Sequence, residues 1–287
     1  MSGMDVRLPE SWAWSPGTRE RGIVTLAEAN YFPGLLTLWR SVQESAPMPV
    51  ACFDIGLTDE QRREAAGYAD LLILPVPEIE PIRTIREAMS SAPPLAKANK
   101  RVWPLWICPV LIAHAPFRRV FWMDCDLVVL RDLATLFGFL DDGPVFTIEN
   151  NAPEATPNKP ALYALLPIGR PFDPNLPHVN AGVSGWDLGR DRAALDAYLY
   201  PVFRACEDER VRAAVSWHDQ GALIWAIQRC GLEDRVLTDR EWNLCIRHAP
   251  EPARALRWGD GFLDAARAAA PATKLLHWNG NAPPWLA

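Results

Sequence analysis

The chain has 287 residues, of which 49% are hydrophobic and 22% charged, a balance typical of one large soluble α/β domain. Its formal net charge of -6 argues against a nucleic-acid surface built on phosphate neutralisation. No apolar run approaches the ~18 residues needed to cross a membrane, and the N-terminus lacks the pattern of a secretory signal.

The first elements predict the start of a nucleotide-binding α/β unit. Residues 1–20 are irregular and we expect them to form an arm, with a single domain over 21–287. Gly22–Leu26 predicts a strand and Ala27–Tyr31 a polar loop, and apolar residues at helical spacing follow from Leu35 to Val42. No G-x-G-x-x-G is present, which excludes a dinucleotide fingerprint.

The next elements continue this alternation. Val50–Ile55 predicts a second strand, and Thr58 predicts a helix N-cap, with Gln61 completing a capping box. Leu71–Leu74 predicts a third strand, and the proline-rich segment after it predicts a loop.

The middle of the chain is rich in proline. Ala96–Ala113 predicts a helix broken by Pro104 and Pro109, and Gly143–Ile148 predicts a strand. Asn150–Pro177 shows little periodicity, and we interpret it as a loop on the acceptor side, because long irregular segments in compact domains are usually functional.

The last third predicts two helices and a final strand. Arg190–Tyr200 has the pattern of an amphipathic helix, and a second helix is expected from His218 to Gln228. Lys274–His277 predicts the last strand. The six cysteines form no C-x-x-C pair, which favours reduced thiols and a cytoplasmic location.

One stretch carries the strongest chemical signal. Val120–Met123 predicts a buried strand, and Asp124-Cys125-Asp126 follows it directly. Unpaired buried carboxylates are costly, so such groups are exposed, paired or bound to metal. In open α/β sheets ligands lie at the carboxyl ends of strands, and two carboxylates there suit Mg²⁺ or Mn²⁺. A strand-end turn with a helix-capping aspartate is the structural alternative.

Five segments in order resemble glycosyltransferases of the GT-A fold, closest in pattern to the retaining family 8 enzymes. They are VTLAEANY, VFWMDCDLVVLRDLATLF, VNAGVSGWDL, HDQ with its helix, and HWNGNAPPW. The resemblance implies a single Rossmann-like GT-A domain whose mixed central sheet is flanked by helices. It also implies transfer of a hexose from a UDP-sugar, with Mn²⁺ or Mg²⁺, to a glycan, lipid-linked or small-molecule acceptor.

The resemblance also implies roles for individual residues. Asp124, Asp126 and His277 would bind the metal, Asp219 would hold a sugar hydroxyl, and Gln220 would lie near the anomeric carbon. The remaining donor contacts would come from Leu26, Ala27, Glu28, Asn30, Tyr31, Cys125, Asn180, Ala181, Gly182, Asn279 and Gly280.

The chain departs from the family pattern where a terminal lysine should meet the diphosphate, because Pro283 stands there. The family's basic residue on the helix before the Asp124 strand is missing as well. Lys100, Arg101 or Lys274 could replace the terminal lysine, and Lys97, Lys100 or Arg101 the helix residue. Two other functions remain open. One is a phosphohydrolase of the haloacid dehalogenase type, with Asp124 and Asp126 joined by the Gly259–Asp264 motif. The other is a non-catalytic protein that binds nucleotide sugars or glycans.

Overall fold

The computed structural model describes residues 6–90, 103–153, 159–215, 218–279 and 283–286. Its centre is a seven-stranded sheet in the order β3-β2-β1-β4-β7-β6-β8. The strands are β1 (Arg19–Glu28), β2 (Val50–Gly56), β3 (Leu71–Pro75), β4 (Phe117–Met123), β6 (Val145–Pro153), β7 (Pro177–Asp187) and β8 (Val236–Leu237).

The sheet is mixed, as the sequence predicted. β1, β2, β3 and β4 run parallel, so their carboxyl ends lie at one edge. β7 runs antiparallel to both β4 and β6. A smaller sheet joins β5 (Leu127–Val129), β10 (Leu275–His277) and β9 (Leu244–Cys245). β10 lies antiparallel to β5, which follows β4 after a short turn.

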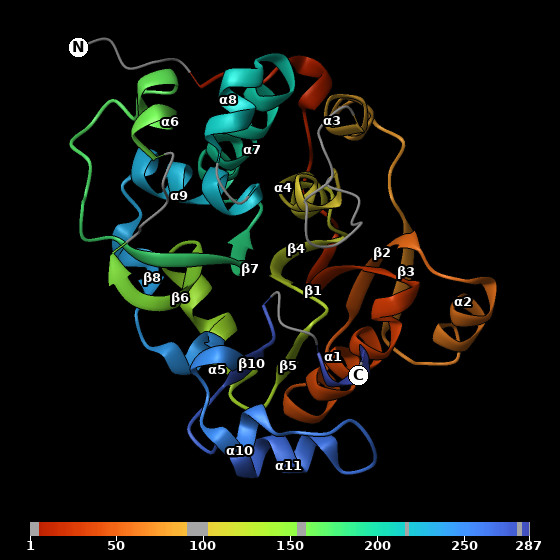
Figure 1. Ribbon diagram of the computed structural model, residues 1–287. Coiled ribbons are helices and arrows are strands. Elements are labelled where there is room, and N and C mark those ends of the chain that lie inside the picture. The colour runs from red at the N-terminus through yellow and green to blue at the C-terminus, as the bar shows by residue number, and fades with distance from the viewer. Residues whose placement is uncertain (1–5, 91–102, 154–158, 216–217, 280–282, 287) are drawn as a thin grey trace.

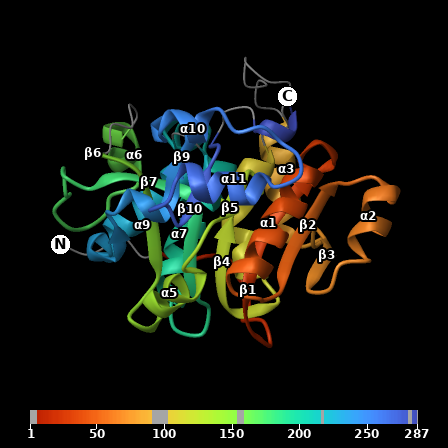
Figure 2. The ribbon, with the colours of Figure 1, turned by 90° about the horizontal axis from the view of Figure 1, so that it is seen from below.

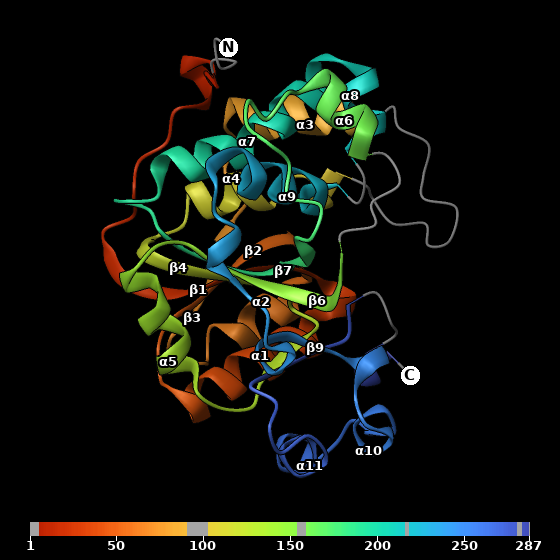
Figure 3. The same ribbon diagram turned by 90° about the vertical axis from the view of Figure 1, so that its left-hand side faces the viewer.

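Helices cover both faces of the central sheet (Figures 1 and 3). One layer contains α3 (Glu80–Ser90), α4 (Cys108–Ala113), α6 (Lys159–Leu165), α7 (Arg192–Glu207), α8 (Glu209–Ala214) and α9 (Asp219–Cys230). The other contains α1 (Phe32–Ser45), α2 (Asp59–Ala65) and α5 (Leu133–Gly138). Viewed from below in Figure 2, α11 (Phe262–Ala269) lies over the small sheet, near α10 (Glu251–Arg254).

Successive side chains of β4 point alternately into the two helix layers, so this strand is buried on both faces. Val120 and Trp122 pack into the α7–α9 layer, whereas Phe121 and Met123 pack into the α1 layer. A central strand covered on both faces must be continuously apolar, and all four residues are at most 2% exposed. The first polar residue, Asp124, therefore marks the point where the strand leaves the core.

Two predicted loops contain helices. Helix α3 follows β3 after four residues, and its Ile82, Ile85 and Met89 are buried at helical spacing. The expected irregular segment 150–177 begins with the last residues of β6, and α6 lies within it. Both predictions gave the prolines too much weight. A proline at the end of a strand or in the first turn of a helix does not interrupt that element.

Other differences are smaller. Pro109 lies in the first turn of α4, where it starts the helix instead of breaking it. Helix α7 starts at Arg192 and extends to Glu207, seven residues past the predicted end. The capping box of Thr58 and Gln61 is confirmed, with both reciprocal hydrogen bonds formed.

The residues before β1 lie against the domain. Trp12 and Trp14 are buried, and the Trp14 indole N–H donates to Asp196 Oδ1 at 2.8 Å. β1 itself begins at Arg19, two residues before the predicted start of the domain. Within the described ranges, no helix combines the length and apolar character needed to cross a membrane.

Candidate metal and donor site

Asp124 is fixed where β4 ends. Its backbone N–H donates to Gly182 O of β7 at 2.9 Å, which continues the ladder between the two strands by one residue. The Trp122 indole N–H donates to Asp124 Oδ1, also at 2.9 Å. These bonds leave Oδ2 of a side chain that is 41% exposed to face the neighbouring strand β10.

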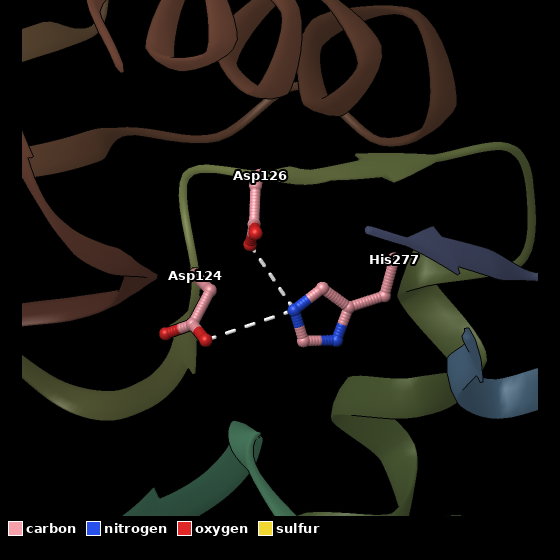
Figure 4. A group of neighbouring side chains, drawn as sticks. All are labelled: Asp124, Asp126 and His277. Atoms are coloured by element: carbon pink, nitrogen blue, oxygen red, sulfur yellow. Dashed lines mark hydrogen bonds and ion pairs between the residues drawn. The ribbon is translucent and has the colours of Figure 1, made fainter. Parts of the chain in front are cut away.

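The fold brings His277 to the two aspartates across about half of the chain (Figure 4). His277 lies opposite Leu127 in the β5–β10 pair, and Trp278 N donates to Asp126 O at 3.0 Å. His277 Nε2 lies 3.1 Å from Asp126 Oδ1 and 3.6 Å from Asp124 Oδ2. One ligand atom from each residue lies within 4.8 Å of the other two.

The charges of this cluster suit a divalent cation. Burial by itself would lower the pKa of His277, but the charge of Asp126 and hydrogen bonds to both carboxylates raise that pKa to about 9. A cation bound between these side chains would replace the imidazole proton. The donor set, two carboxylate oxygens and one imidazole nitrogen, therefore fits Mn²⁺ or a similar metal.

The close packing around position 182 explains why a glycine follows Asn180 and Ala181. A Cβ at this position would lie 2.5 Å from His277 Cε1 and 2.6 Å from Asp124 Oδ2. The backbone of β7 therefore forms one wall of the cluster, and only glycine leaves room for both ligands.

Five of the predicted donor contacts lie at the carboxyl end of β1, which neighbours β4. Leu26, Ala27 and Glu28 end the strand, and Asn30 and Tyr31 belong to the 3-10 turn that leads into α1. The first turn of α1 closely approaches the loop Asp124–Asp126, because a Cβ on Gly34 would lie 2.4 Å from Cys125 O. Glu28, Asn30 and Tyr31 all keep some exposure, whereas Ala27 and Cys125 are buried.

The predicted catalytic pair begins helix α9. Gln220 Oε1 accepts from Asn180 Nδ2 at 3.3 Å and from Ala181 N at 3.4 Å. Burial, together with the charge of Asp124, raises the pKa of Asp219 to about 8. A carboxyl group with such a pKa is largely protonated at neutral pH and can donate a hydrogen bond as well as accept one.

Four residues of the same region were missed by sequence reasoning. Asn243 Oδ1 lies 3.0 Å from His277 Nδ1, and Asn243 Nδ2 donates to Asn180 Oδ1 at 2.9 Å. Glu149, in the middle of β6, is ion-paired to Arg247, and its Oε2 lies 3.6 Å from His178 Nε2. Glu149 follows the apolar run VFTI, the same signal that identified Asp124, whereas nothing in the sequence distinguishes Asn243.

The C-terminal segment is described only in part. Asn279 Nδ2 donates to Glu149 Oε2 at 3.1 Å, while Gly280 lies outside the described residues. Pro283 is buried. Among the proposed replacements for the missing basic residues, Lys274 instead pairs with Asp132 at 2.6 Å, and Lys97, Lys100 and Arg101 lie outside the described ranges.

The phosphohydrolase motif does not reach the cluster. Asp264 is exposed and pairs with Arg267 at 3.2 Å. Gly259, Asp260 and Asp264 line a separate surface cavity of about 560 Å³ beside α1. In the part of the chain that is described, the group of metal-ligand atoms around Asp124 and Asp126 is completed by His277 and not by Asp264.

Comparison with known proteins identifies the fold. By sequence, the chain matches no family model and no curated protein. By structure, it is similar to the galactosyltransferase LgtC in complex with donor and acceptor sugar analogs, with a TM-score of 0.60 over 92% of this chain and 88% of LgtC at 18% identity. The chain has the GT-A glycosyltransferase fold.

Two further solved glycosyltransferase structures agree with this assignment. The bifunctional glycosyltransferase WbbM gives a TM-score of 0.54 at 13% identity, over 93% of this chain and 47% of WbbM. Mouse xyloside xylosyltransferase 1 gives 0.51 at 13% identity, over 93% of this chain and 100% of the mouse chain. The resemblance to family 8 that the motifs indicated is thus confirmed at the level of the fold.

Proposed function

We propose that this protein is a retaining, divalent-metal-dependent glycosyltransferase that moves a hexose from a nucleotide sugar, UDP-linked, to an acceptor. The observation that carries the proposal is the Asp124, Asp126 and His277 cluster at the carboxyl end of the central strand in a GT-A fold. Gln220 and Asn180 are linked to the same cluster through Asn243, so the metal and sugar sides form one continuous site.

The charges of the reaction explain why such a cluster is needed. Breaking a sugar–diphosphate bond leaves positive charge on the sugar and negative charge on the departing diphosphate. A divalent cation held by Asp124, Asp126 and His277 would stabilise the negative charge as a Lewis acid. Because imidazole joins the two carboxylates, Mn²⁺ is favoured over Mg²⁺.

The sugar would be held by residues of β7 and α9. Asp219 would bond a sugar hydroxyl, and burial, which raises the pKa of this carboxyl group, favours the protonated form that can donate as well as accept. Gln220 would lie beside the anomeric carbon. Its Oε1 already accepts two hydrogen bonds, which reduces its strength as a nucleophile and favours shielding of the cationic sugar over direct attack. One solved LgtC structure is itself described as an active-site glutamine mutant.

The nucleoside would contact Glu28, Asn30 and Tyr31. The remaining donor contacts would come from Leu26, Ala27, Cys125, Ala181, Gly182, Asn279 and Gly280. Without a lysine at position 283, the cation carries more of the charge neutralisation, so donor affinity should depend unusually strongly on Mn²⁺. The acceptor is a glycan, a lipid-linked sugar or a small molecule, and the location is cytoplasmic.

One pair of assays tests this proposal. UDP-sugar hydrolysis with Mn²⁺ is compared with phosphate-ester hydrolysis with Mg²⁺, in the wild type and in two variants. Asp126→Ala should abolish the UDP-sugar activity, whereas the matched control Asp264→Ala, which removes an exposed carboxylate of the alternative motif, should retain it.

The outcomes separate the three functions. Phosphate-ester hydrolysis sensitive to both variants would identify a phosphohydrolase. Binding of UDP-sugar without any turnover, with a range of acceptors supplied, would identify a non-catalytic binding protein. Both results would contradict the transferase proposal.

A further inference from the structure

A buried chain of side-chain amides connects the metal cluster to Gln220. It runs from His277 Nδ1 to Asn243 Oδ1 at 3.0 Å, from Asn243 Nδ2 to Asn180 Oδ1 at 2.9 Å, and from Asn180 Nδ2 to Gln220 Oε1 at 3.3 Å. His277 is 0% exposed, Asn243 1%, Asn180 2% and Gln220 8%. Water therefore has little access, and the hydrogen-bond partners of each amide must come from the protein.

Two backbone N–H groups fix the direction of every bond in this chain. Gly182 N lies 3.1 Å from one Asn180 side-chain atom, which must be the oxygen because a backbone N–H can only donate. The Asn243 atom that meets this oxygen must then be the nitrogen, so the Asn243 oxygen faces His277 Nδ1. In the same way Ala181 N fixes Oε1 of Gln220, which directs Gln220 Nε2 toward His178 Nε2 at 2.9 Å.

The direction of the bonds determines the states of both histidines. His277 Nδ1 must carry a proton, since it faces an oxygen, so Nε2 is the nitrogen left to bind a metal beside Asp126 and Asp124. His178 Nε2 must accept from Gln220, so it carries no proton and makes no ion pair with Glu149 at 3.6 Å. The Asn243 side chain bonds both the metal ligand His277 and, on the sugar side, Asn180.

We propose that Asn243 is a positioning residue that couples the metal site to Gln220. It holds the His277 ring with Nε2 toward the cation, and through Asn180 it sets the orientation of the Gln220 amide. Removal of a residue that hydrogen-bonds a metal ligand typically lowers metal affinity 10- to 100-fold. The role of the Gln220 end rests on the proposed transfer reaction, whereas the metal end rests only on the proposed metal binding.

The test measures Mn²⁺ binding to metal-free protein by electron paramagnetic resonance, alongside turnover. Asn243→Ala should weaken Mn²⁺ binding about 10- to 100-fold, because no group then fixes the imidazole. Asn243→Asp still accepts from His277 Nδ1 but cannot donate to Asn180. It should therefore bind Mn²⁺ at least as well as the wild type while kcat falls at least about tenfold, with KM for the donor little changed.

Thr147→Val is the matched control. Thr147 Oγ1 accepts from Asn243 Nδ2 at 3.0 Å, so this nearly isosteric change perturbs the same buried neighbourhood without interrupting the chain from His277 to Gln220. Its Mn²⁺ affinity should stay within about twofold of the wild type. Circular dichroism establishes that each variant is folded.

Two results would overturn the inference while leaving the proposed function intact: a folded Asn243→Ala that binds Mn²⁺ as the wild type does, or a Thr147→Val that loses as much affinity. If Asn243→Ala does not fold, the Asn243→Asp variant alone tests the inference. Retained Mn²⁺ affinity with reduced kcat supports the inference, and any other combination refutes it. A wild type that binds no Mn²⁺ at all would overturn the proposed metal dependence and this inference with it.

Discussion

Gly182→Ala is expected to disable the metal site through a single added methyl group. The new Cβ would lie 2.5 Å from His277 Cε1, 2.6 Å from Asp124 Oδ2 and 2.9 Å from Asn180 Oδ1. Carbon atoms in favourable contact lie about 3.5–4.0 Å apart, so the imidazole must retreat by about 1 Å. Such a shift would stretch the bond between His277 Nδ1 and Asn243 Oδ1, which measures 3.0 Å.

Two effects should therefore appear together. Overpacking of this kind costs about 1–3 kcal/mol of folding free energy. Misplacement of one ligand and its outer partner should lower Mn²⁺ affinity about 10- to 100-fold, or about 1.4–2.7 kcal/mol. Thermal melting with and without Mn²⁺, together with direct titration of the metal, separates the two effects.

Gly185→Ala provides the control on the same strand. Its Cβ would lie 2.4 Å from Phe121 Cε1, in the core and not in the metal cluster. This variant should melt at a lower temperature than the wild type, yet bind Mn²⁺ with unchanged affinity while folded. Equal losses of Mn²⁺ affinity in the two variants, or no loss in Gly182→Ala, would refute the reasoning that the glycine is required by the ligands.

Three further predictions concern pH, the diphosphate and stereochemistry. Burial lowers the pKa of His277, but Asp126 and Asp124 raise it from 6.5 to about 9, and burial with the charge of Asp124 raises that of Asp219 from 3.8 to about 8. Both groups hold protons more tightly in the folded state, so the metal-free protein should lose stability as pH rises from 6.5 towards 9. Bound Mn²⁺ should abolish the share of this pH dependence that comes from His277. A melting temperature that rises with pH in EDTA would contradict the predicted loss of stability. Pro283→Lys should tighten UDP binding in Mn²⁺ by about one to two decades, measured by calorimetry, because a lysine–phosphate bond is worth about 1.5–3 kcal/mol; unchanged affinity would mean that the C-terminal segment does not cover the diphosphate. The product should keep the α configuration of the donor, and β-linked product in an NMR spectrum would exclude a retaining mechanism.

Much of the fold can be read from the sequence because its signals are local. The run Val120–Met123 predicts a doubly covered strand, and Thr58 with Gln61 predicts a helix start, since both patterns depend only on neighbours in the chain. Helix α3 was within reach as well, because Ile82, Ile85 and Met89 carry a helical period that the surrounding prolines obscured. Glu149 repeats the strand-end signal of Asp124 and could have been found by the same argument.

The sequence by itself determined which residues were available for a metal, because carboxylates directly after a buried strand are exposed, paired or bound to metal. Only the tertiary structure decided that His277 meets Asp124 and Asp126, since this depends on the pairing of β10 with β5. The role of Asn243 had no local signal at all. An asparagine in a short 3-10 segment becomes a positioning residue only when strands distant in sequence enclose it, and when backbone N–H groups of β7 fix the direction of its hydrogen bonds.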